Sequence, residues 1–305
     1  MIVLLGPNGQ LGWELRRALA PLDEVLALDR APLADGSCGD LTNTAALVHT
    51  LRVLKPRVVV NAAAYTAVDK AETEPIEAQA VNAIAPGVIA REVAAWGGWL
   101  VHYSSDYVFD GSGLQARSED DPTGPLSVYG HSKLAGEQAV RSSGCPHLLF
   151  RTSWVHAARG GNFARTMLRL AAERDTLRVV NDQVGAPTGA DWLADATAHA
   201  LRQALADPSL SGVYHACASG HTTWCNYARH VLAWGHAAGM ALRARPEAVQ
   251  GIPTDEFPTP AKRPLNSRLD TRKLRQSFGL SVPTWQAGVD RMLTEALPSF
   301  LKSSP

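Results

Sequence analysis

Residues 1–12 read MIVLLGPNGQLG, and this stretch places Gly6, Gly9 and Gly12 directly after a short apolar run. The run IVLL is typical of a strand that is buried on both faces of a parallel sheet. Apolar residues on one side of residues 10–20 predict a helix after the glycines. Glycines at a strand–helix junction permit a tight turn and let a pyrophosphate approach the backbone, where helix N–H groups point at the anion. The stretch therefore predicts the first βαβ unit of a dinucleotide-binding fold.

The rest of the first half repeats this alternation of strand and helix. It predicts right-handed crossovers and a Rossmann-type, doubly wound parallel sheet in an α/β protein. The alternation loosens after Ser153, where proline-bearing loops appear, and this predicts a smaller α/β substrate domain. We therefore expect a dinucleotide-binding domain at 1–153 and a mainly substrate-binding domain at 154–305. Strands near 177–180 and 213–216 are expected to return to the first sheet. The predicted strands of the first half are 25–28, 57–64, 99–105 and 147–153, and its later helices are 42–54, 78–96 and 125–143.

Charge and composition exclude several classes of partner. The chain has 305 residues, and its 29 Lys+Arg balance its 29 Asp+Glu. A net charge of zero gives no support to nucleic acid or an anionic membrane as the main partner. No apolar stretch reaches the roughly 18 residues of a membrane span, and the apolar start is too short for a signal peptide. The four cysteines form no C-x-x-C pair, so reduced thiols in a cytoplasmic protein are expected.

Asp29 ends the second predicted strand, close to the expected distance from the glycine loop. A carboxylate at this place can accept hydrogen bonds from the adenosine ribose of NAD. Arg30 follows it and can meet the 2′-phosphate of NADP. The pair leaves the choice between NADH and NADPH open, and a surface Asp–Arg turn is the alternative interpretation.

A second pattern lies in LSVYGHSKLAGEQ, residues 126–138, where Tyr129 and Lys133 share one helix face. A lysine cation about 5 Å away, at an effective dielectric of about 20, favours the phenolate by roughly 3 kcal/mol. That would lower the phenol pKa from about 10 by about two units, towards working pH. Ser104 and Ser105 end the preceding strand, at the edge where open α/β sheets bind ligands. The set suits carbonyl reduction, with Tyr129 as proton donor and Ser105 as a hydrogen-bond donor to the carbonyl oxygen.

At this point the sequence resembles the extended short-chain dehydrogenase/reductases and, over nearly the whole chain, the dTDP-4-dehydrorhamnose reductase family. The resemblance implies reduction of dTDP-4-dehydro-L-rhamnose to dTDP-L-rhamnose with NADPH or NADH, by hydride transfer to C4. This step yields the sugar donor for a bacterial cell-surface polysaccharide. The blocks that carry it are NAAAYTAVDKAE (61–72), VHYSSDYVFDG (101–111), YGHSKLAGE (129–137), RTSWV (151–155), NDQVGAPT (181–188) and PTPAKRPLNSRLD (258–270).

The resemblance also assigns roles by position. Tyr129 would be the proton donor and Lys133 its partner, and Ser105 stands where the family more often has Thr. Substrate contacts would fall on Ser105, Asp106 and Trp154. Some members hold magnesium at a homodimer interface through acids that correspond to Glu14, Asp191 and Glu295, for which solvated carboxylates are the alternative. With the glycine loop included, the expected cofactor contacts are Gly6, Gly9, Gln10, Leu11, Gly12, Asp29, Arg30, Asp40, Leu41, Ala64, Tyr65, Thr66, Tyr103, Tyr129 and Lys133.

Two other functions remain open at this stage. One is a nucleotide-sugar epimerase or dehydratase on the same fold, and the other is a non-catalytic dinucleotide-binding regulatory subunit. His215 and His221 lack zinc-ligand spacing, and no G-x-S-x-G supports a hydrolase. Four further tryptophans are expected to be packing or interface residues, namely Trp192, Trp224, Trp234 and Trp285.

Overall fold

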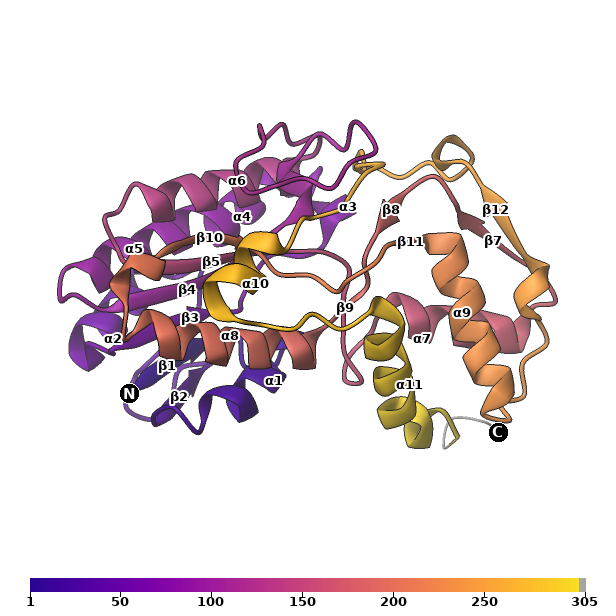
Figure 1. Ribbon diagram of the computed structural model, residues 1–305. Coiled ribbons are helices and arrows are strands. Elements are labelled where there is room, and N and C mark those ends of the chain that lie inside the picture. The colour runs from indigo at the N-terminus through magenta and orange to yellow at the C-terminus, as the bar shows by residue number, and fades with distance from the viewer. Residues whose placement is uncertain (302–305) are drawn as a thin grey trace.

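A six-stranded parallel sheet forms the centre of the larger part of the molecule in the computed structural model, which describes residues 1–301 and the side chains of residues 1–297 (Figure 1). Its order is β2-β1-β3-β4-β5-β10. From β1 the chain adds β2 on one side and then β3 on the other, so the order of strands reverses between β1 and β3. Open α/β sheets bind ligands in the crevice at this point. The predicted fold class is confirmed. The strands are β1 (Ile2–Leu5), β2 (Val25–Leu28), β3 (Val58–Asn61), β4 (Trp99–Ser105), β5 (His147–Thr152) and β10 (Gly212–His215).

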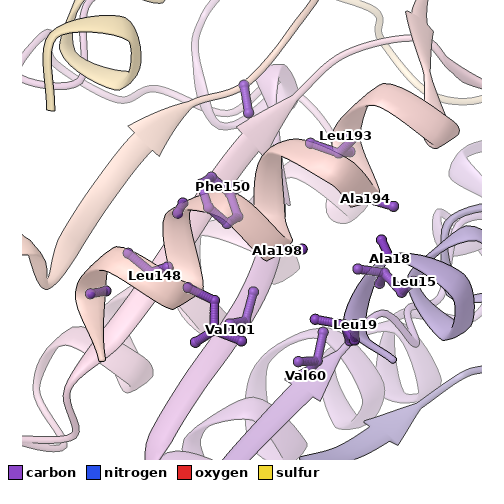
Figure 2. Packing of buried hydrophobic residues seen from close by; sticks show 14 of the residues in the cluster. Leu15, Ala18, Leu19, Val60, Val101, Leu148, Phe150, Leu193, Ala194 and Ala198 are labelled. Carbon is purple, nitrogen blue, oxygen red and sulfur yellow. The ribbon is translucent and has the colours of Figure 1, made fainter. Parts of the chain in front are cut away.

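Helices cover both faces of this sheet (Figure 1). Successive strand residues point to opposite faces, so Leu4 and Val60 pack on one set of helices while Leu5 and Val59 pack on the other. Figure 2 shows the first of these layers, where Leu15, Leu19 and Leu193 meet the sheet. That layer contains α1 (Gln10–Leu19), α8 (Ala190–Ala204) and α10 (Arg272–Phe278), and the other contains α2 (Thr44–Leu54), α5 (Ala85–Ala94) and α6 (Val128–Arg141).

The single helix expected at 78–96 is instead three consecutive pieces. They are α4 (Pro75–Gln79), a π-helical turn η1 (Ala80–Ile84) and α5, with α3 (Val68–Ala71) before them. Pro86 has no N–H, and the N–H of Ala85 bonds back to Ala80, five residues earlier. Asn82, within the widened turn, bonds to both backbone groups of Tyr65 at 2.9 and 3.0 Å. The turn thus fixes the loop that follows β3.

A smaller part of the molecule packs around a second core, which contains Leu168, Tyr227 and Val289. The strand β7 (Leu177–Val180) was expected to return to the main sheet, but it pairs with β12 (Val249–Ile252) instead. The reason is that Leu177 and Val179 face this second core. The strand near 213–216 does join the main sheet, as β10. The helices here are α7 (Phe163–Glu173), α9 (Trp224–Ala237) and α11 (Trp285–Leu301).

Short elements complete the chain as far as it is described. Two small pairings, β6 with β9 and β8 with β11, lie between the two parts. Among the residues described, no helix combines the length and apolar character that a membrane span requires. The short strands are β6 (Val155–His156), β8 (Val184–Gly185), β9 (Thr188–Gly189) and β11 (Thr222–Thr223), and the 3-10 turns are η2 (Asp106–Val108), η3 (Pro208–Leu210), η4 (Pro246–Ala248) and η5 (Thr254–Glu256).

Candidate active site

The glycine loop joins β1 to α1, and each glycine meets a different steric demand. Gly6 has φ +75°, and a Cβ on it would lie 2.8 Å from the backbone of Ala63. A Cβ on Gly12 would lie 2.0 Å from the Gly6 oxygen, so this residue lets α1 approach the loop. Gly9 has open space, with its closest neighbour 3.6 Å away. It is the N-cap of α1 and provides no side-chain cap. The first N–H groups of α1 are therefore free to bind an anion.

This loop opens into a cavity of about 590 Å³ at the carboxyl ends of the strands. The cavity brings together the glycine loop, the ends of β2 to β5 and the start of α9. Its volume is typical of pockets for small molecules and cofactors. Of the expected site residues it contains Gly6, Gly9, Gln10, Leu11, Asp29, Arg30, Asp40, Leu41, Ala64, Thr66, Tyr103, Ser105, Asp106, Tyr129, Lys133 and Trp154.

Asp29 lies in the cavity wall with both carboxylate oxygens engaged. Oδ1 accepts the backbone N–H of Arg30 at 2.8 Å, and Oδ2 accepts the side-chain amide of Asn8. Asn8 comes from the glycine loop and was not expected as a site residue. It ties the loop to the end of β2, where a ribose would be bound.

Tyr129 and Lys133 face the cavity from the first turns of α6. Ser127 begins this helix, and its hydroxyl accepts the N–H of Gly130 at 3.2 Å. A Cβ on Gly130 would lie 2.4 Å from the oxygen of Tyr107, so the helix can pack closely on η2. The Lys133 Nζ donates to the backbone oxygen of Tyr103 at 2.7 Å.

The pKa of Tyr129 differs from the sequence-based expectation. Burial raises it above the usual value of a phenol; Asp106 adds to the rise, and a hydrogen bond with Ser105 opposes it. Lys133 does not contribute to the shift. Burial lowers the pKa of Lys133 itself to about 8. The expected lowering was wrong because it assumed two exposed groups, whereas both side chains are inside the protein. In the ligand-free chain Tyr129 is therefore a neutral phenol that holds its proton.

Ser105 connects Tyr129 with Asp106. The Ser105 hydroxyl donates to Asp106 Oδ1 at 2.9 Å and accepts the N–H of Tyr107 at 3.2 Å. Burial raises the pKa of Asp106 to about 6, although the nearby hydroxyls of Ser267 and Ser105 oppose the rise. Its second oxygen, Oδ2, is buried and has no hydrogen-bond partner within the described part of the chain. This carboxyl group is thus poised to accept a hydrogen bond from a ligand.

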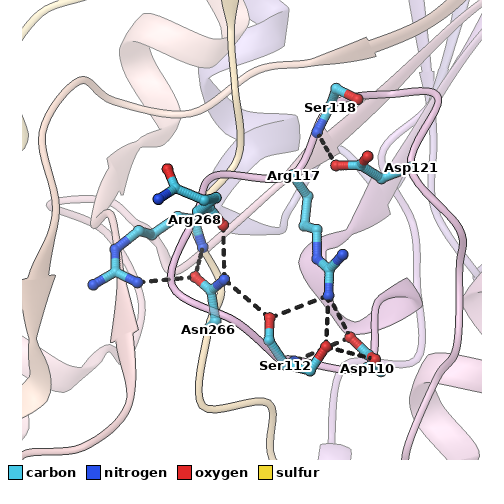
Figure 3. A network of polar contacts seen from close by, with 8 residues as sticks. Asp110, Ser112, Arg117, Ser118, Asp121, Asn266 and Arg268 are labelled. Carbon is cyan, nitrogen blue, oxygen red and sulfur yellow. Dashed lines mark hydrogen bonds and ion pairs between the residues drawn. The ribbon is translucent and has the colours of Figure 1, made fainter.

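Ser267 belongs to a long segment, residues 253–270, that we call the strap. Figure 3 shows how polar contacts hold the strap against the loop after β4. The Asn266 amide donates to the Gln115 oxygen at 2.8 Å, and the N–H of Arg117 donates to the Arg268 oxygen at 2.9 Å. Arg117 also pairs with Asp110 at 2.7 Å. These contacts place Ser267 beside Asp106.

Trp224 was expected to be a packing residue, but it lines the cavity. Its ring stacks on Trp154 with centroids 3.6 Å apart and an interplanar angle of 15°. Trp154 lies two residues after Thr152, the last residue of β5, and has φ +48°, an uncommon conformation for a bulky residue. A Cβ on Gly185 would lie 2.7 Å from the Trp154 ring. We call Trp154 and Trp224 the aromatic wall; only the tertiary structure reveals it.

Two expected cofactor residues lie outside the cavity. The phenol of Tyr65 turns away and donates to Glu74 at 2.5 Å. Gly12 packs on the loop instead of lining the cavity. Tyr103 is at the cavity, but its hydroxyl bonds with Thr197 of α8 at 2.8 Å.

The expected magnesium ligands lie near one another, and two of the three are paired with arginines. Burial raises the pKa of Glu14, Arg17 opposes the rise, and the charges of Glu295 and Asp191 add to it. The guanidinium of Arg291 lies 2.9 Å from Asp191, and that of Arg17 lies 3.7 Å from Glu14. Within residues 1–297, whose side chains are described, no group of three His, Cys, Asp or Glu is arranged to hold a metal ion. The arrangement does not fit a magnesium site.

Comparisons with known proteins agree with this geometry. The RmlD substrate binding domain family matches residues 1–297. The dTDP-4-dehydrorhamnose reductases of Escherichia coli (strain K12) and Salmonella typhimurium (strain LT2) are 52% and 53% identical to the chain, over 96% of its length and 97% of theirs. A crystal structure of a dTDP-4-dehydrorhamnose reductase from Clostridium acetobutylicum is similar with a TM-score of 0.84 and 33% identity, covering 96% of this chain and 98% of that one. Another, from Bacillus anthracis in complex with NADP, has a TM-score of 0.83 and 32% identity over the same shares.

Proposed function

The chain belongs to the dTDP-4-dehydrorhamnose reductase family, and we propose that it reduces dTDP-4-dehydro-L-rhamnose to dTDP-L-rhamnose through Tyr129, Lys133 and Ser105. The observation that carries this proposal is the single cavity that contains the glycine loop and all three of these side chains. A dinucleotide bound along the loop and a sugar carbonyl beside Tyr129 would share one enclosed volume.

The residues at the first end of the cavity fit a dinucleotide. Gly9 leaves the N-terminus of α1 uncapped and sterically open, which suits a pyrophosphate. Asp29 is placed for the adenosine ribose, and Arg30 lies beside it in the cavity wall. We therefore propose NADPH as cofactor, in line with the NADP held by the Bacillus anthracis relative, and expect NADH to be accepted as well. The bound cofactor supplies the hydride.

Tyr129 delivers the proton that completes the reduction. A phenol with a raised pKa holds its proton until a stronger base forms beside it, and the alkoxide that develops at C4 is such a base. The Lys133 ammonium then stabilises the phenolate and can also bind the nicotinamide ribose. The Ser105 hydroxyl donates to Asp106, and by turning it would donate instead to the sugar carbonyl.

The test is to supply dTDP-4-dehydro-L-rhamnose with NADPH or NADH and to identify the product by NMR. We expect dTDP-L-rhamnose and loss of one reduced cofactor for each product molecule. An epimerase or dehydratase would recycle its cofactor, so turnover without net oxidation would overturn the proposal. A regulatory subunit would bind NADPH and give no product with either cofactor.

A further inference from the structure

Glu137 lies on α6 one helical turn beyond Lys133, and Arg151 of β5 holds its carboxylate. Arg151 Nε is 2.9 Å from Oε1, and Nη2 is 2.7 Å from Oε2. The two side chains are only 1% and 3% exposed. A buried ion pair of this kind contributes little net stability over apolar residues of similar volume. Its place beside Lys133 therefore suggests a role in the site.

Lys133 is a buried ammonium that lacks a direct ion pair among the described residues. It is 2% exposed, and its one hydrogen-bond acceptor is the neutral oxygen of Tyr103. Burial lowers the pKa of Lys133 to about 8, and the negative charge of Glu137 is the one contribution that opposes this shift. Burial and the charge of Lys133 lower the pKa of His102, so this neighbouring ring is neutral. The other titratable or charged groups on the elements packed against α6 are Glu72, Glu74, Arg91, Tyr103, Asp106, Tyr107 and Arg151.

We infer that Glu137, held in place by Arg151, is a positioning residue that keeps Lys133 in its ammonium form. This inference rests on the proposed function, because that function gives Lys133 its two tasks. Residues 129, 133 and 137 follow one another at single-turn spacing on one helix face. In the proposed reaction the Lys133 ammonium stabilises the phenolate that Tyr129 becomes, and the negative charge of Glu137 favours that ammonium.

Arg151 explains why this attraction does not become a direct contact. Besides Glu137, its guanidinium donates to the backbone carbonyl oxygen of Glu119 at 3.3 Å and lies 5.1 Å from the centre of the Phe109 ring. Glu137 thus has both oxygens bound and cannot swing to Lys133. An ammonium in direct contact with Glu137 would be drawn away from the phenol. The carboxylate bound by Arg151 instead attracts the Lys133 ammonium from a distance. Lys133 Nζ can then interact with the Tyr129 phenolate and the nicotinamide ribose.

The test measures kcat/KM and the NADPH dissociation constant against pH for the full chain and its variants. The active form needs protonated Lys133, so activity and cofactor affinity fall as pH rises through its pKa. Glu137→Gln removes the charge that raises this pKa. We expect the alkaline limb of both profiles to move to lower pH by about one unit, as for loss of a nearby opposite charge. Glu137→Asp keeps the charge and should move the limb less.

Two controls separate this role from a structural one. Glu92→Gln breaks a similar bidentate pair, with Arg52 at 2.7 and 2.8 Å, on the neighbouring helix α5, and should leave both limbs in place. If Glu137→Gln does not fold, Glu137→Gln with Arg151→Met decides, since it leaves no unpaired buried charge. If Glu137→Gln lowered activity at every pH and left the alkaline limb where it is in the wild type, Glu137 would have only a structural role and the inference would be wrong. If wild-type protein itself shows no turnover, the proposed function fails instead, and the NADPH profile still tests Glu137.

Discussion

The glycine loop is a continuous stretch of residues 6–12, whereas the aromatic wall joins Trp154 and Trp224 from two distant segments, and Gly185 of a third segment packs against it. In the loop, the glycines have no Cβ, and this leaves backbone N–H groups open to an anion. In the wall, two large aromatic rings are held face to face. The comparison teaches that a site for a charged group common to many ligands can be encoded locally. The aromatic wall, by contrast, is assembled from distant parts of the chain.

In the proposed reaction Tyr129 serves both regions, since it would reach a cofactor on the loop and a sugar near the wall. Tyr129→Phe keeps the ring and removes only the proton donor. We expect kcat to fall about 10²- to 10⁴-fold, the usual contribution of a general acid, with NADPH affinity little changed. Steady-state kinetics at saturating cofactor measure this. Tyr65→Phe is the matched control, since that hydroxyl bonds with Glu74 outside the cavity. Retention of more than about a tenth of the activity would remove Tyr129 from its role.

Gly9 and Gly12 divide the loop into a binding position and a packing position. Gly9→Val meets no atom of the chain closer than 3.6 Å at its Cβ, so the fold should persist while the pyrophosphate loses its place. We expect NADPH affinity to fall about 10- to 100-fold, because a hydrogen bond to a charged group contributes about 1.5–3 kcal/mol. Gly12→Ala would place its Cβ 2.0 Å from the Gly6 backbone oxygen, so its main effect should be a lower Tm. Calorimetry measures NADPH binding and thermal melts measure Tm for both variants. Unchanged NADPH binding by Gly9→Val would show that the loop does not bind the pyrophosphate.

Trp224 tests the aromatic wall. Trp224→Ala removes a ring that we expect the dTDP-sugar to contact. Loss of an aromatic contact costs about 0.5–1.5 kcal/mol, so KM for the dTDP-sugar should rise about 2- to 13-fold while NADPH affinity stays constant. Trp234→Ala is the control, because Trp234 packs against the same second core but does not line the cavity. It should lower Tm and leave KM unchanged. Equal changes of KM in both variants would mean that the wall only supports the fold.

The acidic group on α1, α8 and α11 belongs to neither region and should give the smallest effect. Arg17 and Arg291 already pair with Glu14 and Asp191. We therefore expect a chelator to leave kcat unchanged and added magnesium to leave Tm unchanged. A rise of Tm with magnesium, abolished by Asp191→Asn, would contradict this.

The sequence allowed prediction of features that depend on neighbours along the chain. The glycine loop lies between a strand and a helix, and Tyr129 and Lys133 lie at one-turn spacing, so both patterns were visible before folding was considered. The main-sheet strands were predicted for the same reason, since their apolar runs end near turn residues. These features follow from local geometry alone.

What could not be predicted depends on burial and on contacts between distant residues. The pKa of Tyr129 rises because the folded protein excludes water around it, which no spacing reveals. Trp224 looked like any core tryptophan until α9 placed it against Trp154. Likewise β7 has an apolar run that suits the main sheet, but α7 and α9 provide it with a separate core.

The position of β10 at the edge of the main sheet has a consequence for synthesis on the ribosome. β5 ends at Thr152, but its outer neighbour is complete only at His215. At 5–20 residues per second, those 63 residues take about 3–13 s to make. During that delay the outer edge of β5 has unpaired backbone groups, which are prone to pair with other chains. We expect nascent chains arrested before β10 to be more sensitive to protease and to bind chaperones, and the nucleotide-binding half to become resistant only after much of the second half has been made.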